Sequence, residues 1–471
     1  MNVPMKSIRA KWVLPITGPP IEGGEVVVEG DRIVEVRPAR GLASSPAVLD
    51  FGEAVLMPGL VNVHTHLDYT IMRGVLEEIE FFPWIRELTA RKAALTWEDW
   101  VASATWGAAE AVAGGVTTMG DCTDSGAAFY GAKALGLGGI IYQEVFGIDE
   151  RQPVEEIVEE LAGKIAQYQA ESAGTRLTIG VSPHAPYTVR PALFRALAEY
   201  AQREARPLCI HAAESRAEAE LLRLGTGPIA EMFARREIAW DPPGTSAVAY
   251  LDGFGLLGER TLLVHGVQVS AADREIVRER GAAWAHCPKS NAKLGVGVAP
   301  LGLLGLFWKE REERVLEPNA RVGLGSDSVA SNNTMDLFEE MRFAVLVQRA
   351  AHHRIHMLSA PEAVEMATLG GARALGLEAE IGSLEPGKRA DLCAVHLDSL
   401  HSLPAYDPYS ALVYTAHASN VVWTMIAGET RYDASLGPRP EDRFAQINLA
   451  PVRARLNAAA QKMRAWRPSS P

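Results

Sequence analysis

The sequence predicts an α/β fold, a (β/α)8 barrel with a small composite β-sandwich domain built from both termini. Between about residues 58 and 380, short apolar runs alternate with stretches rich in Ala, Leu, Glu and Arg, as in parallel strands separated by helices. Eight such runs, the number that closes this barrel, end near His66, Asp121, Glu144, Pro183, His211, His265, Pro288 and Asp327.

The segments outside the barrel predict short strands joined by turns. Gly24–Gly30 and Asp31–Val36 read as a hairpin around Gly30 and Asp31. Strands return over residues 390–396 and 420–427, and a final helix is expected near residues 449–466. The predicted division is therefore residues 1–57 and 381–440 for the β domain, 58–380 for the barrel and 441–471 for a helical tail.

Composition limits the classes of partner. The chain has 471 residues, 48% of them hydrophobic and 22% charged, with a formal net charge of −12. The acidic balance and the lack of a Lys/Arg block argue against nucleic acid, and no segment approaches a membrane span. We expect a cytoplasmic protein, because the four cysteines are widely spaced and form no CxxC pair. The predicted partners are a small-molecule substrate and further copies of the chain.

The first barrel run carries the strongest chemical signal. It begins near Val55 and ends in His64 and His66, two residues apart. Alternate side chains of a strand point to the same face, so both imidazoles point the same way. Two such histidines can bind one metal ion, and neutral imidazole suits zinc.

Other polar residues fall at the ends of later predicted strands. His211, His265 and Asp327 close runs five, six and eight. The carboxyl ends of barrel strands meet at one mouth, so these side chains should converge with the two histidines. Three neutral imidazoles and one carboxylate leave a dication net positive, which lowers the pKa of bound water toward about 7.

Two residues complete a predicted hydrolytic centre. Glu214 lies three positions after His211 and could move a proton between water and a substrate nitrogen. The alternative is a carboxylate that stabilises a helix N-terminus. His265 could bind the metal or hydrogen-bond the developing oxyanion.

Several motifs resemble the amidohydrolase superfamily. They occur in family order at Met57–His66, Arg73–Gly74, Gly114–Thr118, Ser182–Tyr187, His211–Glu214, His265, His286–Gly295, Gly325–Asn333 and Gly382–Asp391. The resemblance implies one zinc per chain, held by His64, His66, His211 and Asp327, with iron or manganese as possible replacements. It also implies catalytic roles for Glu214 and His265, a substrate contact for His184, and the composite β domain.

The motifs are similar to one branch of the superfamily in particular. This branch holds triazine hydrolases, S-adenosylhomocysteine/methylthioadenosine deaminases and aminodeoxyfutalosine deaminases. An amino group leaves readily only after protonation, as ammonia, so deamination needs residues that relay protons. The chain keeps Glu214, His265 and Asp327 together, which favours deamination. In the implied reaction Asp327 takes the last hydroxyl proton and passes it to the departing amine. A non-catalytic scaffold is the alternative of another class, but none of the four ligand positions is lost.

The substrate prediction depends on two departures from the adenosylhomocysteine-type enzymes. Lys92 or Ala93 stands where a ribose-binding glutamate is expected, and Gln143 replaces an arginine after strand three. We therefore expect aminodeoxyfutalosine, whose benzoate carboxylate Lys92 could meet as a point charge. The purine would stack on Trp84 or Phe82. Methylthioadenosine or adenosylhomocysteine, guanine and triazine substrates remain the alternatives.

Overall fold

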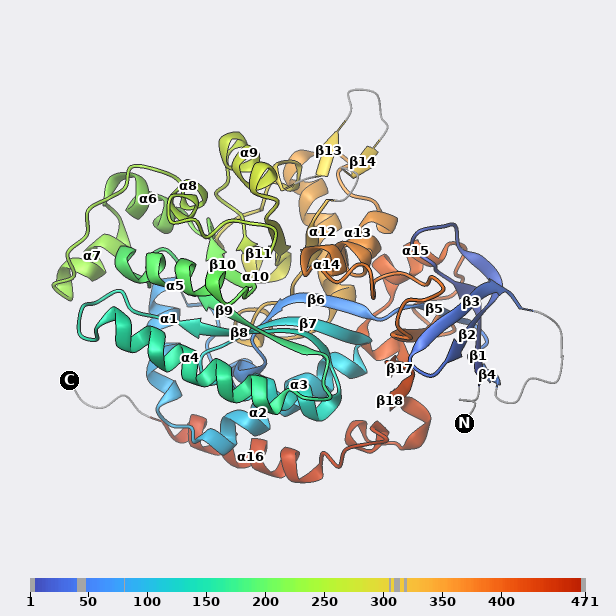
Figure 1. The fold of residues 1–471 in the computed structure, drawn as a ribbon. Helices are drawn as coiled ribbons and strands as arrows, with labels where there is room; N and C mark the ends of the chain where they lie inside the picture. The colour runs from blue at the N-terminus through green and yellow to red at the C-terminus, as the bar shows by residue number, and fades with distance from the viewer. Residues whose placement is uncertain are drawn as a thin grey trace.

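A parallel barrel forms the centre of the molecule (Figure 1). The computed structural model describes residues 5–39, 48–79, 81–304, 306–308, 314–316 and 320–466. Eight strands follow one another in sequence order: β6 (Leu60–Thr65), β7 (Val116–Thr123), β8 (Gly138–Val145), β9 (Leu177–Pro183), β10 (Leu208–Ala212), β11 (Thr261–His265), β12 (Ala283–His286) and β15 (Val322–Leu324). A parallel bridge between Thr65 and Asp327 brings the last strand back to the first. The predicted (β/α)8 barrel is confirmed, and each strand ends within three residues of its predicted end.

Helices follow the strands and cover the outside of the barrel (Figure 1). Their buried residues recur at helical spacing, as in α5, where Leu193, Phe194 and Leu197 face the core. The helices are α1 (Phe81–Lys92), α2 (Trp97–Ala113), α3 (Ala127–Leu135), α4 (Val154–Glu171), α5 (Pro191–Arg203), α6 (Arg216–Leu224), α7 (Pro228–Arg235), α8 (Ala247–Asp252), α9 (Ala271–Arg280), α10 (Pro288–Lys293), α11 (Val329–Asn332), α12 (Leu337–His352), α13 (Ala360–Met366), α14 (Leu369–Ala374), α15 (Pro408–Ser410) and α16 (Ala450–Ala465). Short 3-10 or π segments are η1 (Leu67–Met72), η2 (Leu301–Leu303), η3 (Ala411–Thr415), η4 (Ala418–Asn420), η5 (Ala434–Leu436) and η6 (Pro440–Arg443).

Strands from both ends of the chain form a second sheet beside the barrel (Figure 1). They are β1 (Met5–Val13), β2 (Ile21–Glu29), β3 (Arg32–Pro38), β4 (Val48–Asp50), β5 (Ala54–Pro58), β16 (Leu392–His396), β17 (Val421–Ile426) and β18 (Glu429–Asp433). β5 pairs with β16 in antiparallel register, which joins the two termini. Residues of both origins, including Ile8, Val26, Leu56, Leu392 and Trp423, share one apolar core. The composite β domain is therefore a real unit, and β2 and β3 form the hairpin expected around Gly30.

A single glycine separates the β domain from the barrel. Gly59 lies between β5 and β6, and its backbone N–H donates to the carbonyl of Asp391. A Cβ atom at Gly59 would lie 2.2 Å from Cγ2 of Thr117, so a side chain would displace the neighbouring strand. The Met57–Gly59 motif thus lets one extended segment contribute β5 to the β domain and β6 to the barrel.

The last helix packs against the barrel rather than the β domain. The buried carboxylate of Asp99 on α2 pairs with Lys462 and Arg455 of α16. Burial alone would raise the pKa of Asp99, but these two cations outweigh it and lower the pKa to about 2.

A charged run near the end of the barrel lies mostly outside the described residues. The charged run over residues 309–314 suggests a solvated helix face, but residues 309–313 lie outside the described residues and Arg314 begins β14 (Arg314–Leu316), which pairs with β13 (Leu306–Trp308). Among the described helices, none is both long and apolar enough to cross a membrane.

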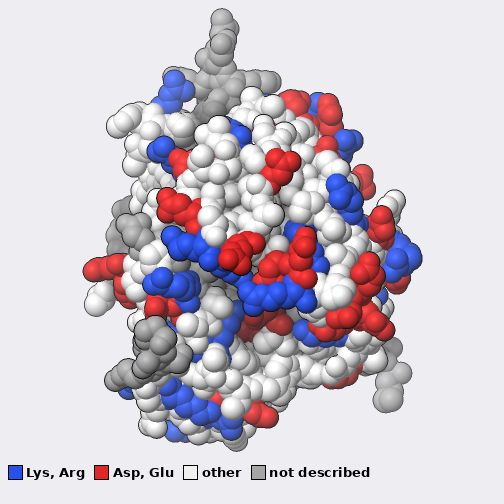
Figure 2. All heavy atoms as spheres, turned by 90° about the vertical axis from the view of Figure 1, so that its left-hand side faces the viewer, with Lys and Arg blue, Asp and Glu red and all other residues white. Residues whose placement is uncertain are grey.

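Figure 2 shows acidic and basic side chains intermixed on one face of the molecule.

Candidate functional site

A cavity of about 460 Å³ opens where the barrel strands end. Side chains from several strand ends line it, together with the wall formed by α1. Of the predicted site residues, the cavity is lined by Trp84 and Lys92 on α1, His66, His184, His211, Glu214, His265 and Asp327. His64 lies directly beneath, fully buried. The predicted convergence of polar groups at one mouth is what the structure shows.

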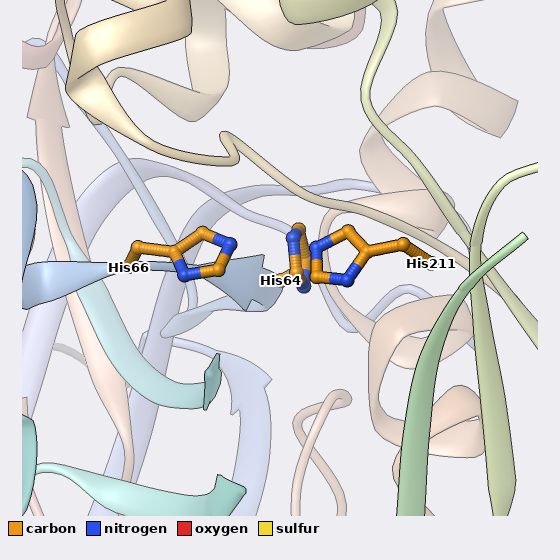
Figure 3. Close-up of side chains that lie close together, drawn as sticks. All are labelled: His64, His66 and His211. Carbon is orange, nitrogen blue, oxygen red and sulfur yellow. The ribbon is translucent and has the colours of Figure 1, made fainter. Parts of the chain in front are cut away.

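Three histidines form the base of the site (Figure 3). His64 and His66 project from β6 and its end, and His211 projects from β10 on the opposite side. One ring nitrogen of each lies within 4.8 Å of those of the others. Oδ1 of Asp327 lies 3.5 Å from Nε2 of His64 and 3.6 Å from Nε2 of His66. The backbone N–H of Asp327 donates to the carbonyl of His64, which holds the carboxylate over the rings.

The ring orientations leave Nε2 atoms for a common ligand. Nδ1 of His211 lies 2.9 Å from the carbonyl oxygen of His184, so it carries the proton and leaves Nε2 as an acceptor. Nδ1 of His64 faces the sulfurs of Cys122 and Cys209 at 3.8 and 3.9 Å, whereas its Nε2 is buried without a hydrogen-bond partner in the described part of the chain. Buried polar atoms without partners are costly. Three imidazoles and one carboxylate therefore fit a divalent cation such as zinc.

Electrostatics agree with neutral histidine ligands at two positions. Burial lowers the pKa of His66 to about 3 and that of His211 well below its usual value. For His64, burial also opposes the charge, but Asp327 and Cys209 outweigh it and raise the pKa to about 10. A cation bound between His64 and Asp327 would compete with the proton that this raised pKa favours on His64.

Glu214 and His265 face each other at the cavity wall. Oε1 of Glu214 lies 3.6 Å from Nε2 of His265, whose Nδ1 is 2.9 Å from Oδ1 of Asn291. Burial raises the pKa of Glu214 above its usual range, the direction expected for a carboxyl group that both accepts and donates protons. Ser215, not Glu214, caps helix α6, with its hydroxyl accepting from the backbone N–H of Glu218. The carboxylate of Glu214 therefore does not cap this helix, and it faces His265 instead.

Backbone strain accompanies these positions. Ala213, His265 and Asp327 have φ angles of 55°, 77° and 56°, in the left-handed region that side chains rarely adopt. The carboxylate of Glu218 accepts from the backbone N–H groups of Ala213 and Glu214 at 3.0 and 2.8 Å, which holds the turn after β10. The strain is thus concentrated where strands end and side chains turn into the cavity.

The predicted substrate-binding residues divide into two groups. His184 and Trp84 line the cavity, and so does Lys92, whose Nζ donates to Asp124 at 2.6 Å and lies 4.7 Å above the ring of Tyr69. Gln143 does not line it, because its amide donates to the backbone carbonyls of Thr123, Asp124 and Glu144 at 3.0, 3.1 and 3.2 Å. The side chain of Phe82 lies outside the described residues.

The sequence did not single out all the polar groups at the site. Glu144 lines the cavity, and Cys122 and Cys209 contact His64 from below. Glu144 closes a predicted strand run, and that position in a barrel was a usable signal. The two cysteines gave none, because each reads as a small apolar residue within a strand.

Comparisons with known proteins agree with this geometry. The model of the amidohydrolase family matches residues 55–431. The chain belongs to the amidohydrolase family. A 5-methylthioadenosine/S-adenosylhomocysteine deaminase of Syntrophobacter fumaroxidans is 33% identical over 415 residues, covering 86% of this chain and 87% of the relative. One from Moorella thermoacetica is also 33% identical, covering 88% and 91%.

Solved structures share the whole architecture. An adenosine deaminase from Xanthomonas campestris with bound zinc superimposes with a TM-score of 0.83 at 28% identity, covering 98% of this chain and 99% of that one. A guanine deaminase of Escherichia coli shares the fold alone, with a TM-score of 0.74 at 19% identity and coverage of 91% and 99%. This amidohydrolase-family protein is a metal-dependent hydrolase that acts on carbon–nitrogen bonds, and the scaffold alternative has no support.

Proposed function

We propose that this protein is a zinc-dependent deaminase of a 6-aminopurine nucleoside with an extended 5′ substituent. The observation that carries the proposal is the buried arrangement of Glu214, His265 and Asp327 beside three converging histidines. His64, His66, His211 and Asp327 would hold one zinc ion per chain. When bound, zinc would supply a Lewis acid that lowers the pKa of water at the site.

The protein's own residues account for the proton movements. Glu214 would take a proton from the water that attacks C6 of the purine and deliver it to N1, which breaks the aromatic system. His265, oriented by Asn291, would hydrogen-bond the new oxygen. Asp327 would take the remaining hydroxyl proton and pass it to the amine, after which the carbon–nitrogen bond breaks and ammonia leaves.

The wall opposite the histidines supports a nucleoside with a large 5′ group. Trp84, Ile85 and Leu88 give it an apolar surface, and Lys92 adds one positive charge. This combination suits an aromatic carboxylate, so the 5′ substituent that we propose is the benzoate-bearing chain of aminodeoxyfutalosine.

The Lys92–Asp124 ion pair favours a second candidate. A zwitterionic amino acid, as in S-adenosylhomocysteine, could match both charges, with its carboxylate at Lys92 and its ammonium group at Asp124. The names of the relatives at 33% identity point in the same direction.

The decisive experiment compares ammonia release from aminodeoxyfutalosine, methylthioadenosine and adenosylhomocysteine by the zinc-loaded protein. We expect the highest kcat/KM for aminodeoxyfutalosine. A preference for adenosylhomocysteine would assign the second candidate, and a preference for methylthioadenosine would overturn both charged 5′ groups while keeping the deaminase. Turnover of guanine or chlorotriazines alone would overturn the nucleoside assignment.

A further inference from the structure

Glu144 is a buried carboxylate that the proposed reaction does not use. It lies near the end of β8, and only 1% of its side chain is exposed. Its Oε2 lies 4.0 Å from Nδ1 of His66, and its Oε1 lies 3.9 Å from Nε2 of His184. One carboxylate therefore stands between a proposed metal ligand and a residue that lines the cavity.

The histidine side of this contact lacks a hydrogen bond. Nδ1 of His66 is buried without a partner among the described residues, and so is Oε1 of Glu144, the carboxylate oxygen that faces His184. A buried N–H or carboxylate left in this state costs about 1–3 kcal/mol or more. The two groups complement each other once Nδ1 of His66 carries the proton.

The other histidines of the site show what His66 lacks. The Nδ1 atoms of His211 and His265 contact oxygen atoms of His184 and Asn291 at 2.9 Å, and that of His64 faces two sulfurs. Metal-binding histidines almost always donate their second nitrogen to such a partner, which sets the tautomer and the ring orientation. For His66 the facing carboxylate is Glu144, while the backbone carbonyl of Cys122 is the competing acceptor.

We propose that Glu144 is a positioning residue that orients His66 for metal binding by accepting a hydrogen bond from its Nδ1, directly or through one water molecule. The inference rests on the proposed metal site. The other oxygen of Glu144 lies 3.9 Å from Nε2 of His184, so the same carboxylate also faces a residue of the cavity wall.

Two variants test the acceptor role. Glu144→Gln keeps the size and one oxygen acceptor, and Glu144→Met keeps the bulk without an oxygen. We expect zinc affinity, measured by competition with a chromogenic chelator, to fall by about 10–100-fold in the Met variant. The Gln variant should lose less. The visible spectrum of the cobalt-loaded protein should change shape in both variants, because the orientation of a ligand changes and the number of ligands does not.

Asp124→Asn is the matched control. Asp124 lines the same cavity just beyond the end of β7, but it pairs with Lys92 rather than with a histidine. Its zinc affinity should stay within about twofold of the parent. Circular dichroism of the metal-free proteins checks the fold, and if the Met variant does not fold, the Gln variant carries the test.

Two outcomes would overturn the inference in different ways. Parent-like zinc affinity and an unchanged cobalt spectrum in both Glu144 variants would show that the carbonyl of Cys122 holds His66 instead. Absence of stoichiometric metal in the parent protein would remove the proposed metal site itself, and the inference with it.

Discussion

The two sides of the cavity differ in how the protein satisfies its own polar groups. On the histidine side, Nε2 of His64 and Nδ1 of His66 are buried without hydrogen-bond partners in the described part of the chain. On the α1 side, Lys92 is already paired with Asp124 and stacked over Tyr69. The first side keeps buried polar atoms without partners, whereas the charged groups Lys92 and Asp124 of the second side already pair with each other.

This difference teaches where strong and weak effects should lie. Removing a side chain from the histidine side should have a large effect, because the buried polar atoms that remain cannot hydrogen-bond to solvent instead. Removing a charge from the α1 side changes a partly exposed ion pair, which contributes little. The predictions below test that ordering, starting with the largest expected effect.

His64→Ala should remove most of the bound zinc. His64 is fully buried beneath the cavity, and its loss removes one of the three converging imidazoles. Elemental analysis of purified protein measures the effect, with His352→Ala on the exposed surface of α12 as the control. Full metal retention in a folded His64→Ala protein would remove His64 from the ligand set.

Glu214→Gln should keep the metal and the fold but lower kcat by about 10²–10⁴-fold, because an amide cannot relay a proton. The backbone around residue 214 is held by Glu218, so the substitution should leave the turn intact. Steady-state ammonia release and metal content are measured together. A kcat near that of the parent would contradict the proton-relay role.

Lys92→Met and Asp124→Asn should alter selectivity by about fivefold, because a partly exposed pair contributes about 1 kcal/mol. With aminodeoxyfutalosine as the substrate, the Lys92 variant should lose kcat/KM and the Asp124 variant should gain it. With adenosylhomocysteine as the substrate, both variants should lose. Methylthioadenosine, which has no charged 5′ group, is the reference substrate for both variants.

Much of the barrel end of the molecule could be predicted from the sequence. The eight strand runs are apolar and short, and their ends carry the polar residues, so the period of the pattern and the rule for parallel strands place His64, His66, His211 and Asp327 together. The confirmed family match and the composite β domain follow from the same motifs. Which atoms bind the metal stays a prediction.

The parts that the sequence missed depend on contacts between distant segments. Gln143 follows the polar pattern of a substrate contact, but its amide meets three carbonyls of its own and neighbouring strand ends. Lys92 lies on α1, and its partner Asp124 lies just beyond the end of β7, 32 positions away, so the sequence around neither residue predicts the pair. Oligomeric state and cellular location stay predictions, since both depend on surfaces and surroundings beyond one chain.

The junction at Gly59 has a consequence for synthesis on the ribosome. β5 and the histidine-bearing β6 leave the ribosome more than 300 residues before β16, which covers one edge of β5. Until then the nascent chain carries an open strand edge, a site where chains aggregate unless it is protected. A truncated chain that contains every barrel strand but ends before β16 would keep that edge open, so the sheet beside the barrel is complete only after the C-terminal strands have been synthesised.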